Sequence, residues 1–279
     1  MNSDDHKIQK NIIIVSYRDK ARFRLADKGK QWGRSVIYRN RIILAHKTFF
    51  VKTAIVTGAT GNMGQAVVKK FLAEGYRVIG TVIPNDPVKT EAGNPNFTTA
   101  VVNLGDEEHT RQFVESVIKE YETIDAAILT VGGFAMGSVA QTGTADILKQ
   151  YQLNFETAYN TARPVFIQMM KQDSGRIFII GSRPGLDAKN SKGMVAYGLS
   201  KSLIFRLAEL MNEEAKGKNV VTSVVVPSTI DTPQNRKGMP DADPSDWVKA
   251  DDIANVIWFY CTEEAAVLRE PLIKLYNKS

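Results

Sequence analysis

The sequence is poor in the residue types that build disulfides and metal centres. It has one cysteine, Cys261, and three histidines, His6, His46 and His109, which lie far apart in the chain. A single cysteine excludes an internal disulfide and a thiolate metal cluster. The scattered histidines argue against a zinc site or a Ser-His-Asp catalytic group. We therefore expect a protein of the reducing cytoplasm whose chemistry uses no metal.

Long apolar runs are also missing. The longest, such as residues 126–129 and 220–227, have the size of single strands and are too short to cross a bilayer. No basic start is followed by a long apolar stretch, so we expect no secretory signal and no membrane partner. The chain has 279 residues, 43% hydrophobic and 24% charged, which is the balance of a globular protein with a sizeable core.

The positive charge is concentrated at the N-terminus. Residues 1–50 hold 12 Lys and Arg against 4 Asp, whereas residues 51–279 hold 24 against 26 acidic residues. We interpret residues 1–50 as a basic extension that is either poorly ordered or upstream sequence included because the start site is placed too early. A nucleic-acid-binding arm is the alternative, although nucleic-acid binding usually requires a basic patch within the fold.

Strand and helix patterns alternate regularly from Val51 onward. Strands are predicted at residues 53–57, 76–83, 97–104, 124–131, 176–181, 220–226 and 271–276. Helices are predicted at residues 65–75, 107–121, 147–170, 196–215 and 251–261. This alternation predicts an α/β fold over residues 51–279, a doubly wound, Rossmann-like parallel sheet with helices on both faces.

Three glycines follow the first strand at three-residue spacing. Glycine permits a tight turn and lets backbone amides approach a pyrophosphate, and the next helix N-terminus attracts the anion. We therefore predict a dinucleotide site at this loop. Its expected contacts are Gly58, Thr60, Gly61, Asn62, Met63 and Gly64.

The end of the second strand usually selects between NAD and NADP. An acidic residue there binds the ribose 2′-hydroxyl, while an arginine accommodates a 2′-phosphate. The residue at this position is Val82, which is neither. The choice stays open, and the lack of an acid favours NADP. Asn103 and Leu104, at the end of the third strand, are expected to flank the adenine.

Tyr197 and Lys201 lie four residues apart, on one face of a predicted helix. A lysine ammonium near a phenol favours the phenolate and lowers its pKa from roughly 10 towards neutral. A tyrosine in this position can donate a proton at physiological pH. Of the nine tyrosines, only Tyr197 has a lysine four residues on.

Together these motifs resemble the short-chain dehydrogenase/reductase family. Five motifs occur in the order usual for that family. They are the glycine loop, Asn154 in the long helix, Ser182 after the fifth strand, the Tyr197–Lys201 pair and residues 227–232. The resemblance implies an NAD(P)H-dependent oxidoreductase acting on a C=O or C=N group of a small molecule. Further cofactor contacts are implied at Val131, Gly132, Gly133, Tyr197, Lys201, Pro227, Ile230 and Thr232.

The resemblance also implies a role for each catalytic residue. Tyr197 would be the general acid in reduction, and Lys201 would lower its pKa and bind the nicotinamide ribose. Ser182 would hold the reacting group, and Asn154 would position a water in a proton relay. The long helices that carry Asn154 and Tyr197 would pair in a homodimer or homotetramer. Apolar residues continue round much of the second helix: Leu203, Ile204, Phe205, Leu207 and Leu210.

Two loops resemble those of dihydropteridine reductases. Residues 132–137 would place Phe134 beside a pterin, and residues 231–243 would place Asn235 and Arg236 in a loop over the site. Those enzymes carry aspartate where this chain has Val82, and they lack the serine found here as Ser182. Carbonyl reduction is therefore favoured, with dihydropteridine reductase as one alternative. A dinucleotide sensor without chemistry is the other.

Overall fold

The computed structural model describes residues 51–86, 91 and 93–278 and, within residues 1–50, the backbone of four short strands. The chain divides into two units, Met1–Phe50 and Val51–Ser279. In the first, β1 (Tyr17–Arg18) pairs with β2 (Ala21–Arg22), and β3 (Val36–Tyr38) pairs with β4 (Arg41–Ile43), both antiparallel. The prediction that residues 1–50 form a poorly ordered extension concerns residues that, apart from these four strands, lie outside the described part of the chain.

A seven-stranded sheet forms the centre of the second unit. Its order is β7 (Phe97–Val101), β6 (Arg77–Val82), β5 (Thr53–Thr57), β8 (Ala126–Leu129), β9 (Ser174–Ile180), β10 (Asn219–Pro227) and β13 (Leu272–Leu275). All neighbouring strands are parallel. Every residue of β5 and β8 is buried, as expected for strands covered on both faces. The predicted doubly wound fold is confirmed.

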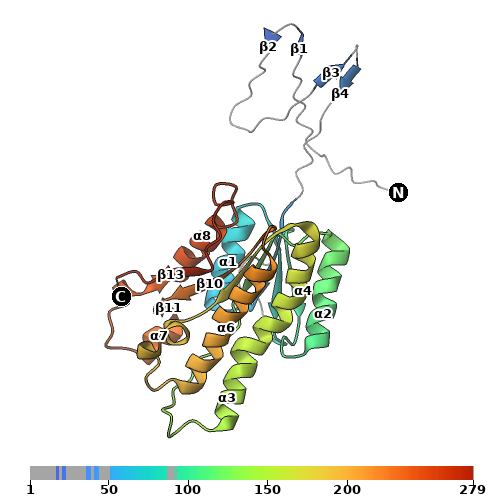
Figure 1. Ribbon diagram of the computed structural model, residues 1–279. Helices are drawn as coiled ribbons and strands as arrows, with labels where there is room; N and C mark the ends of the chain where they lie inside the picture. Colours follow the sequence, from blue (N-terminus) through green and yellow to red (C-terminus); the bar gives the residue numbers. More distant parts are fainter. Residues whose placement is uncertain are drawn as a thin grey trace. The chain divides into compact units, whose positions relative to one another are not determined.

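Helices cover the sheet in two layers (Figure 1). One layer contains α1 (Asn62–Ala73) and α8 (Ala250–Phe259), and the other contains α2 (Glu107–Tyr121), α4 (Thr157–Gln172) and α6 (Val195–Glu214). Phe71 and Ile257 are fully buried in the first layer, and Val165 and Ile204 in the second. Two apolar cores therefore hold the sheet rigidly, and its strand ends are left to build a site.

The chain reverses its direction across the sheet between β5 and β8. In doubly wound sheets such a switch point leaves a crevice at the carboxyl ends of the strands, where ligands bind. Two hydrogen bonds join the two strand ends here. The Thr130 amide donates to Thr57 Oγ1 at 3.0 Å, and Thr130 Oγ1 donates to the Thr57 carbonyl at 2.6 Å. The loops after β5 and β8 consequently meet at one crevice.

The structure differs from the sequence prediction in several local elements. The predicted helix over residues 147–170 is interrupted: α3 (Thr144–Tyr151) leads into a five-residue π-helix, Gln152–Glu156, before α4 begins. The third strand ends at Val101, so the residues expected to flank the adenine follow the strand and do not end it. Within the described residues, no helix is long and apolar enough to span a membrane.

The structure also contains short elements that the sequence pattern does not predict. They are α5 (Arg183–Leu186), a 3₁₀ turn at Ala188–Asn190, β11 (Ile230–Asp231), α7 (Pro233–Gly238), a 3₁₀ turn at Pro244–Asp246 and β12 (Val248–Lys249). The two short strands pair in parallel and close the segment that follows β10.

Candidate active site

The glycine loop after β5 is built so that only glycine fits at key positions. Gly58 has a φ of +63°, which side chains rarely adopt. A Cβ at Gly64 would lie 2.1 Å from the Gly58 carbonyl oxygen, so the start of α1 packs directly on the loop. The Gly58 amide donates to Thr81 Oγ1 at 3.2 Å and ties the loop to β6. This loop can bring backbone amides against a ligand.

The N-terminus of α1 has no side-chain cap. Its N-cap residue is Gly61, which has no side chain to accept a hydrogen bond from the first amides of the helix. Uncapped amides and the positive end of the helix dipole favour an anion. The residues present therefore fit the pyrophosphate of a dinucleotide, and Gly58, Thr60, Gly61, Asn62, Met63 and Gly64 are those that would surround it.

A cavity of about 330 Å³ adjoins the start of α1. It is lined by Asn62, Gln65, Ala66, Lys69, Asp231, Lys249, Ala250 and Asp251. The segment after β10, which sequence reasoning assigned to the nicotinamide end, therefore lies against the helix of the glycine loop. In that segment Pro227 ends β10, Ile230 pairs with Val248, and Thr232 caps α7 by accepting from the Asn235 amide at 3.1 Å.

The four predicted catalytic residues converge beside Gly132. A methyl group on Gly132 would lie 2.7 Å from Asn154 Oδ1 and 3.1 Å from Lys201 Nζ. The hydroxyl of Ser182 lies near the phenol of Tyr197, close enough to lower the pKa of that phenol. Ser182 lies between β9 and α5, and Asn154 lies in the π-helix. Tyr197 and Lys201 lie in α6. Residues 154, 182, 197 and 201 thus form one cluster at the switch point.

Asn154 is fully buried and fastens the loop after β8. Its Oδ1 accepts from the Gly133 amide at 2.9 Å, and its Nδ2 donates to the Gly133 carbonyl at 3.0 Å. The same Nδ2 lies 2.9 Å from Gln150 Oε1 and 3.2 Å from Ser200 Oγ. The side chain thus holds Val131, Gly132 and Gly133 in place through the Gly133 peptide. Its expected contact with a relay water stays a prediction.

Lys201 is buried and donates to the Ile180 carbonyl at 2.8 Å. Burial lowers the pKa of Lys201 to about 8, because the charged ammonium loses its hydration. At pH 7 the amine is still mostly protonated. Its ammonium has two further N–H donors, and Nζ lies beside Gly132 in the loop after β8.

The predicted effect of Lys201 on Tyr197 is not seen in the chain by itself. Burial raises the pKa of Tyr197, and the nearby Ser182 hydroxyl opposes that rise. The expectation of a lowered pKa was wrong because it considered helix spacing alone. Four residues of separation place both side chains on one face, but the Lys201 amine is directed to the end of β9.

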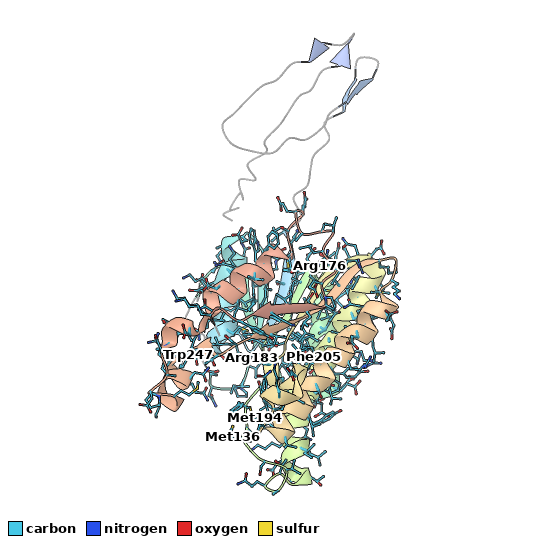
Figure 2. The ribbon with its side chains drawn as sticks, turned by 60° about the vertical axis from the view of Figure 1, so that its left-hand side comes forward. Met136, Arg176, Arg183, Met194, Phe205 and Trp247 are labelled. Carbon is cyan, nitrogen blue, oxygen red and sulfur yellow. The ribbon has the colours of Figure 1, made fainter. Side chains whose placement is uncertain are left out.

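The aromatic residue of the Gly-Gly-Phe segment lies at the catalytic cluster. The ring of Phe134 packs edge-on against that of Tyr197, with centroids 5.1 Å apart and an interplanar angle of 76°. Phe134 is 60% exposed. The segment continues through Met136 and runs beside Met194 at the start of α6 (Figure 2), where the Gly137 amide donates to the Gly193 carbonyl at 2.7 Å. An open aromatic wall therefore flanks the Tyr197 phenol.

The other two predicted substrate residues have partners of their own. Asn235 Nδ2 donates to the Ile230 carbonyl at 2.8 Å. Arg236 forms a bidentate ion pair with Asp231, at 2.6 and 2.9 Å. Both side chains organise the α7 segment in this structure, and no contact places them beside Tyr197.

Sequence reasoning missed a carboxylate at the glycine loop. Thr60 Oγ1 donates to Asp86 Oδ2 at 2.5 Å. Asp86 lies four residues beyond Val82, in the turn after β6, whereas Val82 itself is buried at the strand end. No motif marks the position, because the turn and not the strand carries the acid. Within the described residues, no three His, Cys, Asp or Glu side chains gather as a metal site would require.

The fold and this cluster define a dinucleotide-dependent oxidoreductase. The sequence pattern of the family described as short chain dehydrogenase matches residues 52–243, and the chain belongs to this family of NAD(P)-dependent enzymes.

Named relatives are similar over most of their length. A 3-oxoacyl-[acyl-carrier-protein] reductase of Thermotoga maritima is 25% identical over 80% of this chain and 95% of its own. A dihydropteridine reductase of Dictyostelium discoideum is 25% identical over 82% and 96%. The solved structure of ElxO with NADP bound superposes with a TM-score of 0.74 at 21% identity, covering 81% of this chain and 97% of the other.

Proposed function

We propose that the protein reduces a C=O or C=N group of a small molecule, with Tyr197 as the proton donor. The observation that carries this proposal is the proximity of the Ser182 hydroxyl to the Tyr197 phenol, in a site where Asn154 and Lys201 meet beside Gly132. A substrate oxygen that accepts from the Ser182 hydroxyl would also lie within reach of the Tyr197 phenol. NAD(P)H, when bound, supplies the hydride.

Residues of the chain would supply the proton and position the reacting group. Ser182 donates a hydrogen bond that polarises the reacting group, and the Tyr197 phenol gives its proton to the substrate oxygen or nitrogen. The raised pKa of Tyr197 keeps the phenol protonated before reaction. Lys201 would donate a hydrogen bond to the nicotinamide ribose through the N–H groups that Ile180 does not use. Asn154 fixes the peptide at Gly133 and so holds one wall of the crevice.

Steady-state turnover tests this proposal. The protein is assayed with NADH and NADPH against aldehydes, ketones, quinones and quinonoid dihydropterin. Tyr197→Phe is expected to lower kcat/KM roughly 100-fold or more, because it removes the general acid. Tyr121→Phe, which changes a half-buried tyrosine at the end of α2, is the matched control. Turnover that survives in Tyr197→Phe would reject the role of the phenol. Cofactor binding without any hydride transfer would favour a sensor.

Pterin reduction is the second candidate. Its support is the position of Phe134, whose ring meets Tyr197 and could stack on a planar substrate. The ion pair between Arg236 and Asp231 does not favour it, because the arginine is already paired. Phe134→Leu is expected to raise KM for quinonoid dihydropterin and to leave small aliphatic aldehydes unchanged. The opposite pattern would favour ordinary carbonyl reduction.

We further propose that residues 51–279 form a single reductase domain and that copies associate through α4 and α6. A chain that begins at Val51 should retain turnover. If residues 1–50 serve instead as a nucleic-acid arm, the full chain binds nucleic acid in a salt-dependent way and the shortened chain does not.

A further inference from the structure

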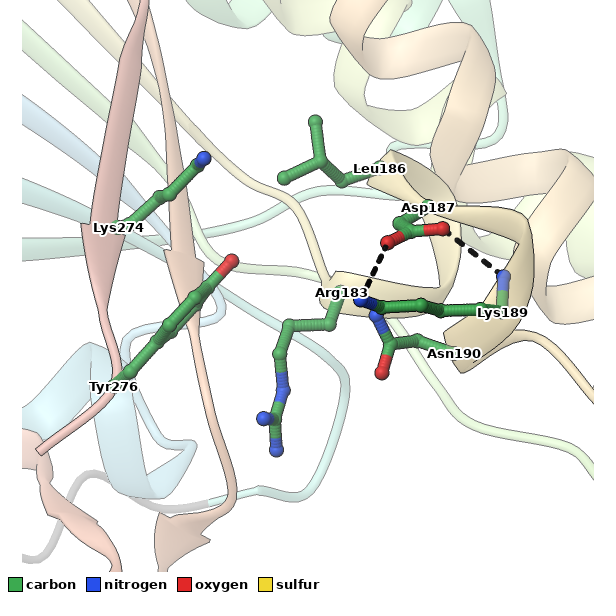
Figure 3. Close-up of a pocket in the computed structure, with 7 residues that line it drawn as sticks. All are labelled: Arg183, Leu186, Asp187, Lys189, Asn190, Lys274 and Tyr276. Carbon is green, nitrogen blue, oxygen red and sulfur yellow. Dashed lines mark hydrogen bonds and ion pairs between the residues drawn. The ribbon is translucent and has the colours of Figure 1, made fainter. Parts of the chain in front are cut away.

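A second cavity, distinct from the dinucleotide crevice, lies between α5 and the end of β13. Its volume is about 490 Å³, which is within the range of small-molecule sites. Figure 3 shows Lys274 and Tyr276 on one side, Asp187 and Lys189 on the other, and the guanidinium of Arg183 between them.

The charges that line this cavity are unbalanced. Three cationic side chains face one carboxylate, and that carboxylate is already engaged: Asp187 accepts from the Lys189 amide at 3.0 Å and lies 3.8 Å from its ammonium. Among the ion pairs of the described residues, none involves Arg183 or Lys274. Two cations with no carboxylate partner among the described residues therefore border a partly open cavity, and both are available to an anion.

The cavity also has an aromatic and apolar wall. The guanidinium carbon of Arg183 lies 5.3 Å from the centre of the Tyr276 ring, and Leu186 lines the same space. An arginine stacked near an aromatic ring keeps its planar fork oriented for a carboxylate or phosphate. A ligand with a planar body and one anionic group matches both the ring and the charge.

Both elements that border the cavity are connected to segments of the proposed active site. Arg183 follows Ser182 directly, and Ser182 caps the helix α5 that carries it. On the other side, Ser228 Oγ donates to the Tyr276 carbonyl at 3.0 Å, next to the end of β10. The helix that carries Arg183 thus begins at Ser182, the residue beside Tyr197.

We propose that this cavity binds the carboxylate or phosphate of a planar small molecule and that the enzyme thereby prefers substrates with such a group. The second part rests on the proposed function. Arg183 and Lys274 bind the anion, and Tyr276 and Leu186 contact the body that carries it.

Calorimetric titration with phenyl phosphate, benzoate and neutral benzyl alcohol tests the site. The wild-type protein should bind at least one of the two anions and not the alcohol, and the tighter anion distinguishes phosphate from carboxylate. Arg183→Gln/Lys274→Gln should weaken that binding roughly tenfold or more, because charge-assisted hydrogen bonds are lost. Arg206→Gln, which changes an exposed arginine of α6, should not. Equal binding by the double variant, as expected if the anion sits at the glycine loop, would overturn the site.

Turnover tests the preference separately. For 3- and 4-carboxybenzaldehyde the double variant should raise KM roughly tenfold with kcat kept, while the matching methylbenzaldehydes change little. Equal changes in both series would reject the preference. If the wild-type protein reduces no carbonyl compound at all, the proposed function fails together with this preference, whereas the titration still decides the site.

Discussion

Lys201 is a buried amine whose protonation opposes folding. Its pKa is about 8 in the folded chain, against roughly 10.4 when exposed, so the unfolded chain binds more protons between these values. Stability contributed by this group therefore rises with pH in that window. Compared with Lys201→Met, the wild-type free energy of unfolding should increase by about 2 kcal/mol between pH 8 and pH 10.

Urea unfolding at the two pH values measures this difference. Other titrating groups are shared by the two chains and cancel in the comparison. Lys171→Met, at an exposed lysine on α4, should follow the wild-type pH dependence. If Lys201→Met also shows the wild-type pH dependence, the Lys201 amine does not titrate between pH 8 and pH 10.

Asp86 places a negative charge where the sequence showed none. The residue at the strand end, Val82, gave no reason to exclude NADP, but the Asp86 carboxylate contacts Thr60 in the glycine loop. A carboxylate near the adenosine ribose would repel a 2′-phosphate and could accept from a 2′-hydroxyl. Asp86→Asn keeps an oxygen for Thr60 and removes the charge.

We expect Asp86→Asn to tighten NADP⁺ binding relative to NAD⁺ by roughly tenfold. Dissociation constants of the two nucleotides, measured by titration, give the ratio without any turnover. Glu209→Gln, on the exposed side of α6, serves as the control for a lost negative charge. An unchanged ratio would show that Asp86 does not face the ribose.

At the scale of elements, the bounds of helices and strands could be predicted where capping or turn residues mark their ends. Strand Thr53–Thr57 and helix Glu107–Tyr121 have the predicted bounds, because a glycine loop follows the first and Asp106 caps the second. The π-helix at Gln152–Glu156 escaped prediction, since one wider turn barely changes the apolar period. The π-helix carries Asn154, whose side chain forms two hydrogen bonds with the backbone of Gly133.

The short helices α5 and α7 did have a signal in the sequence. Each begins with a hydroxyl residue closely followed by proline: Ser182 with Pro184, and Thr232 with Pro233. A serine or threonine cap with proline in the first turn is typical of helix starts. The residues of the proposed catalytic cluster were predictable because each lies in a motif. Asp86 and the cavity at Arg183 were not, since their contacts join segments far apart in the chain.

At the scale of the whole molecule, α6 divides its apolar residues between two tasks. Ile204 is fully buried, and Phe205 and Leu207 pack against the core. Leu199, Leu203 and Leu210 are exposed, and their spacing of four and seven residues places them on one face. Tyr159 and Ile167 are exposed on α4. Apolar side chains gathered in this way are typical of an interface between subunits.

We expect the protein to sediment as a dimer or a larger oligomer at micromolar concentration. Leu203→Glu/Leu210→Glu should shift it towards the monomer, because two charges would be buried without partners in a symmetric contact. Val267→Glu tests the same change at an exposed apolar residue outside the helices and should leave the oligomer intact. Far-UV circular dichroism verifies that both variants are folded. A wild-type chain that stays monomeric as its concentration rises would show that these leucines face solvent, and the interface would then have to be sought elsewhere.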